Sequence, residues 1–409
     1  MEGVLQLFEE KKNMKIVYIS YNTPYRDNIG GTSALPYHLM VNRPQDVEVV
    51  IYSFNTNGLS AEKIAAVERE LTVKICLMPT PGLFQKILNA GAMGLLVRTL
   101  LPYPLHHYLL LDRKYRDEII AMKLDGVWIY GEELTGISLQ LPDIPQVHTG
   151  PDCEALYYER LLCKPWLGRM KRLRCEIMQQ KFRRLAAKAP ECAVYHCVGE
   201  ADVECLKRLN GRVRAKFIRH PHYNYCEERV VKFAEPKIKL LLAGRNDLYM
   251  QGCAAELVDV LAHHTDLADC FAFTFLGKGW EQEAEKLTSN GWDCRHVTFA
   301  DDYMAEICSH DIQLVPISIG TGTKGKVLDA FANGLLVIGT DYALENIAVE
   351  HGKDCLQYQS ADEVVAMLGD IAANRAKYEA MAESGRAAVL KHHDRAEASQ
   401  QLLSLFSVR

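Results

Sequence analysis

Short apolar strands alternate with helices along this chain of 409 residues, and the alternation runs through twice. Met14–Ser20 predicts a first buried strand, and Ile238–Ala243 begins a second round after a stretch without periodic pattern. Such alternation predicts parallel sheets with helices on both faces. We therefore expect an α/β protein with two tandem Rossmann-like, doubly wound domains facing a central cleft. The predicted parts are an N-terminal acceptor-binding domain (1–220), a linker (221–236) and a C-terminal donor-binding domain (237–385). A C-terminal helix (386–409) is predicted to pack back on the first domain.

A strand, a glycine loop and a helix follow one another near residue 320. Asp311–Pro316 predicts the strand, Ile317–Thr323 the loop, and Lys324–Ala332 the helix. The first N–H groups of a helix lack partners and lie at the positive end of its dipole, so they attract anions. Lys326 lies in the first turn, where a cation normally opposes that dipole, unless it answers a bound negative charge. The pattern predicts a phosphate site.

Composition and charge narrow the class of protein. A net charge of −5 gives no reason to expect a nucleic-acid partner. The thirteen cysteines form no Cys-x-x-Cys pair, which favours reduced thiols in a cytoplasmic protein without a metal site. We find no pattern typical of a signal peptide. Charged residues interrupt the apolar stretch of residues 82–111, so no segment reaches the ~20 apolar residues of a membrane span.

A strongly basic segment follows that apolar stretch. Arg160–Lys188 holds ten Lys and Arg residues against the single acid Glu176, and residues 83–111 are rich in Leu, Met and aromatic residues. A basic surface beside an exposed apolar helix is typical of proteins that dock on anionic membranes. The alternative is a solvated helix face beside ordinary core. The sequence leaves both open.

The second domain resembles the donor-binding half of retaining GT-B glycosyltransferases of family 4. The pieces that carry the resemblance fall in order on the expected elements. In the second domain they are Ala243-Gly244-Arg245, Phe275–Gly279, Pro316–Thr340, and Tyr342–Ile347 with Gly352 and Asp354; in the first they are Gly30-Gly31 and Val198–Asp202.

The resemblance implies transfer of a sugar, with retention, from a nucleoside-diphosphate sugar to a glycan or lipid-linked acceptor, in polysaccharide or glycoconjugate biosynthesis. Such a reaction needs the leaving diphosphate to be neutralised, here by Arg245 and Lys326 without a metal. His148, at the end of a predicted strand, would contact the donor sugar or the acceptor. A surface ion pair for Arg245, and a structural histidine at 148, are the alternative interpretations.

The resemblance also implies a set of donor-binding residues. Asp329 would accept the ribose hydroxyls, as the acid of a dinucleotide fold does; its alternative is an i,i+3 ion pair with Lys326. Glu345 resembles a family carboxylate near the donor, although a glutamate near a helix start is also a routine dipole partner. The full expected set is Gly30, Gly31, Gly244, Gly322, Thr323, Asp329 and Glu345.

Three positions depart from the family pattern. Thr321 replaces the first of two glutamates, Asp329 shortens the second, and Met250 stands where a lysine usually follows the arginine. These changes leave room for a sugar-nucleotide epimerase or phosphorylase of the same fold, or for an inactive sugar-nucleotide binding subunit. A dehydrogenase is disfavoured because no Gly-x-Gly-x-x-Gly follows a predicted strand.

Overall fold

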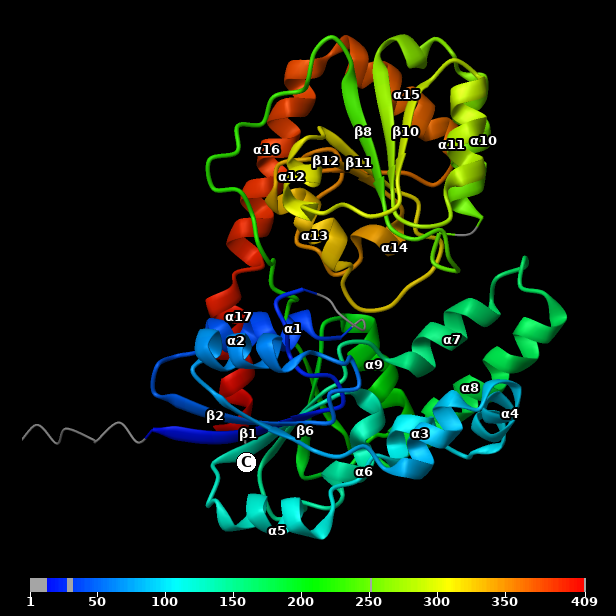
Figure 1. Ribbon diagram of the computed structural model, residues 1–409. Coiled ribbons are helices and arrows are strands. Elements are labelled where there is room, and N and C mark those ends of the chain that lie inside the picture. The colour runs from blue at the N-terminus through cyan, green and yellow to red at the C-terminus, as the bar shows by residue number, and fades with distance from the viewer. Residues whose placement is uncertain (1–12, 28–31, 251, 408–409) are drawn as a thin grey trace, which may run out of the picture.

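The computed structural model describes residues 13–27, 32–250 and 252–407, which form two lobes (Figure 1). The first lobe contains a seven-stranded sheet with the order β3-β2-β1-β4-β5-β6-β7, in which every neighbouring pair is parallel. Its strands are β1 Met14–Ser20, β2 Val47–Ser53, β3 Lys74–Leu77, β4 Gly126–Tyr130, β5 Gln146–Thr149, β6 Ala193–Cys197 and β7 Arg214–Phe217.

The second lobe repeats the design with a six-stranded parallel sheet of order β10-β9-β8-β11-β12-β13. Its strands are β8 Ile238–Ala243, β9 Phe271–Leu276, β10 Asp293–Val297, β11 Ile312–Val315, β12 Leu336–Gly339 and β13 Leu356–Gln357. The predicted fold class, two doubly wound α/β domains, is confirmed.

Helices cover both faces of each sheet (Figure 1). Those of the first lobe are α1 Ala34–Val41, α2 Ala61–Leu71, α3 Gly82–Asn89, α4 Gly91–Leu100, α5 Arg113–Ala121, α6 Thr135–Ser138, α7 Glu154–Leu162, α8 Arg169–Ala187 and α9 Glu200–Leu209. Those that follow are α10 Cys253–His263, α11 Glu281–Ser289, α12 Tyr303–Cys308, α13 Gly325–Ala332, α14 Asp341–Leu344, α15 Ala361–Ala373, α16 Arg375–His392 and α17 Arg395–Ser404. No helix among the described residues has the length and apolar character needed to cross a bilayer.

The two faces of the first sheet explain why its strands are continuously apolar. Ile16 and Tyr18 of β1 pack into one core cluster, while Val17 and Ile19 pack into another on the opposite face. All four side chains are fully buried. A parallel strand covered on both faces needs apolar residues at successive positions, not at alternate ones.

The C-terminal helical region connects the two lobes. The sequence predicts one helix over residues 378–405, but the structure divides it at His393 and Asp394 into α16 and α17. Asp394 caps α17, and the ring of His393 contacts the backbone of both His220 and Ala348. Helix α17 packs against α1, and its apolar residues join the core of the first lobe (Figure 1).

Each sheet reverses its winding direction at one point, between β1 and β4 in the first and between β8 and β11 in the second. In such sheets ligands bind beyond the carboxyl ends of the strands at the reversal point. The loops that leave these ends face each other across the domain interface. Gly322 of the second domain, for example, donates a hydrogen bond to Asp202 of the first.

Candidate active site between the two domains

A cavity of about 180 Å³ lies at the reversal point of the second sheet. Its walls come from the carboxyl ends of β8 and β11 and from the N-terminus of α13, and they include Ala243, Gly244, Arg245, Val315, Ile317 and Lys326. A larger cavity of about 530 Å³ lies at the amino edge of the first sheet, beside Met14, Asp125 and Phe406. Only the smaller cavity occupies the position where doubly wound sheets bind ligands.

Gly244 turns the chain sharply at the end of β8. Its φ is +146°, and a Cβ at this position would lie 2.8 Å from the Cε of Met250. Its carbonyl accepts a 2.7 Å hydrogen bond from the buried indole of Trp280. This fixed turn leaves Arg245 exposed at the cavity wall. Met250, which replaces the lysine of the family pattern, is buried and supplies no charge.

Arg245 and Lys326, the pair predicted to neutralise a diphosphate, line the same cavity. Desolvation lowers the pKa of Lys326, and the positive charge of Arg245 lowers it further, while Asp329 and Asp247 oppose this shift. The N–H groups of Gly325 and Lys326, at the start of α13, have no hydrogen-bond partner within the described residues. Two cations and free helix N–H groups together form a site suited to an anion.

Asp329 lies one turn further along α13 and does not line this cavity. Burial raises its pKa from 3.8 to about 7, and the charge of Lys326 limits that rise. Burial is the main cause of the raised pKa values of Tyr223 and Tyr303, and the charge of Asp329 raises both further. Among the described residues Asp329 forms no ion pair with Lys326, so the structure does not bear out the alternative of an i,i+3 pair, although the charge of Lys326 acts on the carboxyl.

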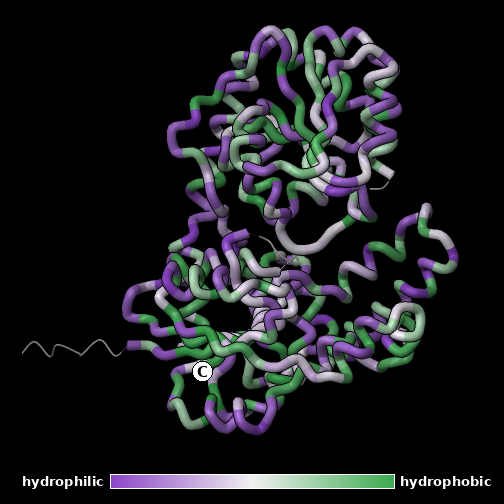
Figure 2. The backbone as a smooth tube through the Cα atoms, in the orientation of Figure 1, coloured by the Kyte–Doolittle hydropathy of each residue, from purple (hydrophilic) through white to green (hydrophobic). Residues whose placement is uncertain are grey.

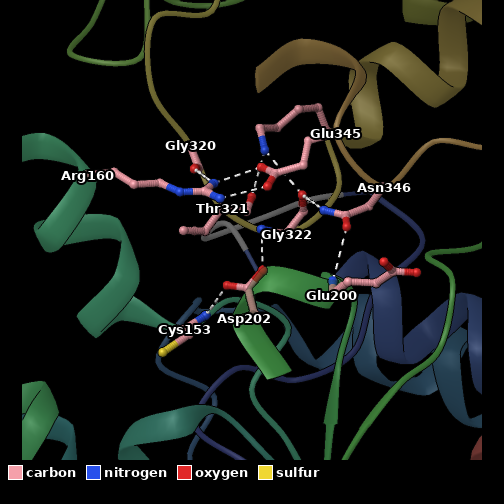
Figure 3. A network of polar contacts seen from close by, with 10 residues as sticks. Cys153, Arg160, Glu200, Asp202, Gly320, Thr321, Gly322, Glu345 and Asn346 are labelled. Atoms are coloured by element: carbon pink, nitrogen blue, oxygen red, sulfur yellow. Dashed lines mark hydrogen bonds and ion pairs between the residues drawn. The ribbon is translucent and has the colours of Figure 1, made fainter. Parts of the chain in front are cut away.

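The glycine loop before α13 is held by the first domain (Figure 3). Asp202, a buried residue of α9, accepts one hydrogen bond from the N–H of Gly322 at 2.9 Å and another from the N–H of Cys153 at 2.7 Å. The hydroxyl of Thr323 donates to the carbonyl of Val198 at 2.6 Å. The structure therefore differs from the expectation that the Gly322 N–H binds phosphate, because the first domain engages it; the Thr323 hydroxyl is engaged as well, and a role for its N–H stays a prediction.

Gly322 also allows the two domains to approach closely. Its φ is +58°, and a Cβ there would lie only 1.7 Å from Oδ1 of Asp152 in the first domain. A side chain at this position would be strained by the backbone and would collide with the carboxyl. The glycine is thus required by the domain contact itself.

Arg160 and Glu345 form a charged contact across the interface (Figure 3). Two N–O distances of 2.7 Å join them, and Arg160 also donates to the carbonyl of Gly320 at 2.6 Å. The hydrogen bond to Glu345 raises the pKa of Arg160. Glu345, which was expected near the donor, therefore binds Arg160 at the domain interface. Arg160, which the sequence placed in a basic surface, is taken up by the same contact.

Asn346, the next residue, joins the same interface. Its side-chain amide donates to the carbonyl of Gly322 at 2.7 Å, and its oxygen accepts from the N–H of Glu200 at 3.1 Å. The backbone of Asn346 has φ +67°, a conformation that asparagine tolerates better than most residues. The segment after α14 thus joins the glycine loop of the second domain to the start of α9 in the first domain.

Two carboxyl groups of the first domain, those of Asp152 and Asp202, face this loop. Burial raises the pKa of Asp152 to about 7, with Asp202 adding to the rise and Lys324 opposing it. Burial likewise raises the pKa of Glu154 to about 8. The amine of Lys324 lies near Asp152 and Asp202 and donates to the carbonyls of Thr321 and Gly322. Sequence reasoning assigned no role to Asp152 and Glu154, although both follow the predicted strand that ends at His148.

His148 does not face the cleft. Its side chain is 0% exposed, its Nε2 lies 2.8 Å from the carbonyl oxygen of Gly131, and its ring stacks on Tyr195. Burial lowers its pKa to about 4, so the ring is neutral near pH 7. These contacts correct the expectation that it touches sugar or acceptor, and they describe a structural histidine. Gly30 and Gly31 lie outside the described residues.

Among the described residues, no three His, Cys, Asp or Glu side chains are grouped as a metal site would require. The positive charge near the cavity comes instead from side chains and helix N–H groups.

Comparison with known proteins supports the architecture. The profile of a family described as glycosyl transferase-like matches residues 254–404. HepE from Anabaena, solved with UDP-glucose, shares 14% identity at a TM-score of 0.62, covering 97% of this chain and 100% of that one. The sequence has no significant match among curated proteins.

Other solved structures share the same arrangement. A glycosyltransferase from Rickettsia africae shares 10% identity at a TM-score of 0.63, covering 97% of this chain and 98% of that one. Sucrose-phosphate synthase from Thermosynechococcus elongatus shares 13% identity at a TM-score of 0.58, covering 96% and 98%. The chain therefore has the GT-B fold, and over residues 254–404 it matches the glycosyl transferase-like family, which confirms the resemblance drawn from its motifs.

Proposed function

We propose that the protein is a glycosyltransferase that moves a sugar, with retention of configuration, from a nucleoside-diphosphate sugar to a glycan or lipid-linked acceptor. The observation that carries the proposal is the convergence of Arg245, Lys326 and the N-terminus of α13 on one cavity at the reversal point of the second sheet. The match to a glycosyl transferase-like family and the UDP-glucose bound by the similar HepE support it.

The reaction breaks the bond between the anomeric carbon and the diphosphate oxygen, so negative charge grows on the departing diphosphate. Arg245 offers a planar guanidinium that can bind two phosphate oxygens, and Lys326 offers a compact charge beside it. Groups fixed in this way before the reaction stabilise the developing charge without reorganising. No metal ion is required in this proposal.

The acceptor side of the site belongs to the first domain. The Asp152 carboxyl faces the glycine loop, and the raised pKa values of Asp152 and Glu154 lie near neutral pH, where a carboxyl is most effective as a general acid or base. We propose that these residues help to hold the acceptor hydroxyl. Asp329, one helical turn beyond the cavity wall and with a pKa of about 7, would hold the ribose of a donor that extends past the cavity.

The proposal extends to polysaccharide or glycoconjugate biosynthesis at the cytoplasmic face of a membrane. The basic segment around α8 supports a peripheral location there.

Slow hydrolysis of the donor tests the proposed function. The protein is incubated with a panel of nucleoside-diphosphate sugars, and release of free sugar and nucleotide is measured. We expect one donor to be hydrolysed and Lys326→Ala to slow its hydrolysis on the order of 10²-fold or more. Lys353→Ala, which removes an exposed charge elsewhere in the second domain, serves as the matched control. Binding of a donor without turnover, with or without acceptors, would instead indicate a binding subunit.

A further inference from the structure

Helices α3 and α4 carry a set of large apolar side chains that nothing in the described chain covers. Leu83 is 71% exposed, Met93 66%, and Leu100 75%, and Leu88, Leu95 and Leu96 are exposed as well. Figure 1 shows α3 and α4 projecting with α7 and α8 at one side of the first domain, and Figure 2 shows hydrophobic segments in this region. So many exposed leucines in one place indicate a contact surface.

This projection is built as a firm unit. Phe84 is buried in the core of the first domain and anchors α3. Helices α3 and α4 pack closely, because a Cβ on Gly94 would lie 2.1 Å from the carbonyl oxygen of Ile87. The amine of Lys181 on α8 donates to the carbonyl of Arg98 on α4, so α8 is joined to the apolar pair. The apolar side chains are therefore held outward by packing on their other faces.

The charge around this surface is mainly positive, with Glu176 as the one acid of α8. Residues 82–111 contain no Asp or Glu. Along α8 and its end, six basic side chains are exposed: Arg169, Lys171, Arg174, Arg183, Arg184 and Lys188. Three basic residues of the predicted surface are engaged elsewhere, since Arg160 pairs with Glu345, Lys181 is buried and Arg172 donates to the carbonyls of Leu162 and Lys164.

We propose that the exposed faces of α3 and α4, with the exposed basic residues of α8, dock the protein on a bilayer of anionic phospholipids. Leucine and methionine side chains would enter the headgroup and acyl boundary, while the Lys and Arg side chains would bind the phosphate groups. An uncharged protein partner would satisfy the apolar face but not the six cations, whereas the headgroup phosphates and acyl chains of an anionic bilayer would satisfy both. The inference deepens the proposed function by naming where the enzyme works, and it rests on that function only for the identity of the acceptor.

Vesicle flotation with the full chain tests the proposal, with vesicles of phosphatidylcholine alone or mixed with phosphatidylglycerol. We expect binding to the mixed vesicles only, weakened by salt because the attraction is electrostatic. The triple variant Arg169→Gln, Lys171→Gln, Arg174→Gln should bind on the order of 10²-fold more weakly, at about fivefold per charge. Its control, Lys232→Gln, Lys353→Gln, Lys391→Gln, removes three exposed charges from the linker and second domain and should bind like the unaltered protein.

A second pair of variants tests the apolar contribution. Leu83→Asn, Met93→Asn, Leu100→Asn should weaken binding at least about tenfold per side chain even at low salt. Val230→Asn, Phe299→Asn alters two side chains that are as exposed but lie outside the surface, and it should bind normally. Because all five side chains are exposed, the variants should fold alike.

Three outcomes overturn the proposal. The first is that the unaltered protein does not bind anionic vesicles, and the second is that the variants and their controls lose binding equally. The third is a dimer in sedimentation that dissociates in the Leu83, Met93, Leu100 variant while neither form binds vesicles. Flotation uses no sugar donor, so its result is independent of donor hydrolysis. If the protein hydrolyses a donor but does not bind vesicles, only the membrane-docking surface is contradicted. If it binds vesicles but hydrolyses no donor, only the proposed function is contradicted.

Discussion

The guanidinium of Arg160, on α7 of the first domain, and the carboxylate of Glu345, after α14 of the second, form a two-point ion pair with both N–O distances at 2.7 Å. Both side chains are mostly buried, with exposures of 18% and 23%. The pair sits directly beside the glycine loop, because Arg160 also binds the carbonyl of Gly320. One arginine thus links the domain interface to the loop that leads into the cavity.

Removing either partner should loosen this interface. Arg160→Ala leaves the Glu345 carboxylate without its partner, and we expect a loss of about 1–3 kcal/mol in the free energy of unfolding, measured with urea. Arg208→Ala breaks a solvent-exposed pair with Glu159 on neighbouring helices and should cost less than about 1 kcal/mol. Equal effects of the two substitutions would contradict the structural role given to Arg160.

Gly322→Ala tests the close approach of the domains. The new Cβ would meet the Asp152 carboxyl in addition to backbone strain at φ +58°. Gly352 has φ +80° with open space around it, so Gly352→Ala measures backbone strain alone, about 1 kcal/mol. We expect the first variant to lose clearly more thermal stability than the second. Similar losses would mean that Gly322 and Asp152 are not in contact.

The fold was predictable because the periodic pattern of a parallel sheet is local. Runs such as Met14–Ser20 and Ile238–Ala243 are apolar at nearly every position, and both are buried strands in the structure. The division of the C-terminal helix was not predicted, since it depends on His393 contacting His220, at the end of the first domain, and Ala348 of the second domain at once.

The candidate site likewise has parts that the sequence predicted and parts that it did not. Arg245 and Lys326 follow strand ends of one domain, so the order of elements alone brings them to one cavity. Local sequence pattern does not predict contacts between domains. The sequence assigned Arg160 to a basic segment and Glu345 to a donor-binding motif, whereas in the structure the two side chains form an ion pair. His148 was misplaced because a strand-end position does not reveal that the ring turns toward Gly131 and Tyr195.

Stability should depend on pH through partly buried carboxyls. Burial raises the pKa of Asp152 and of Asp329 from 3.8 to about 7. Between these values the folded chain binds more protons than the unfolded chain, so the free energy of unfolding should fall as pH rises from about 4 to about 7. The double variant Asp152→Asn, Asp329→Asn should flatten this slope, as urea unfolding across the range would show.

The matched control for that series is Asp293→Asn, Asp301→Asn, which alters two exposed carboxylates of the second domain. Its slope should follow that of the unaltered protein. A slope that is unchanged in the Asp152, Asp329 variant would show that both carboxyls are ionised in the folded chain, and that the burial described here does not govern their protonation.

Calorimetric titration with the nucleoside diphosphate of the hydrolysed donor tests the central claim most directly. Arg245→Ala and Lys326→Ala should each weaken binding about 10- to 100-fold, since each removes a charged hydrogen bond to phosphate, while Lys353→Ala should leave affinity unchanged. Unaltered affinity in both cavity variants would contradict the account, because the diphosphate would then be bound elsewhere in the molecule.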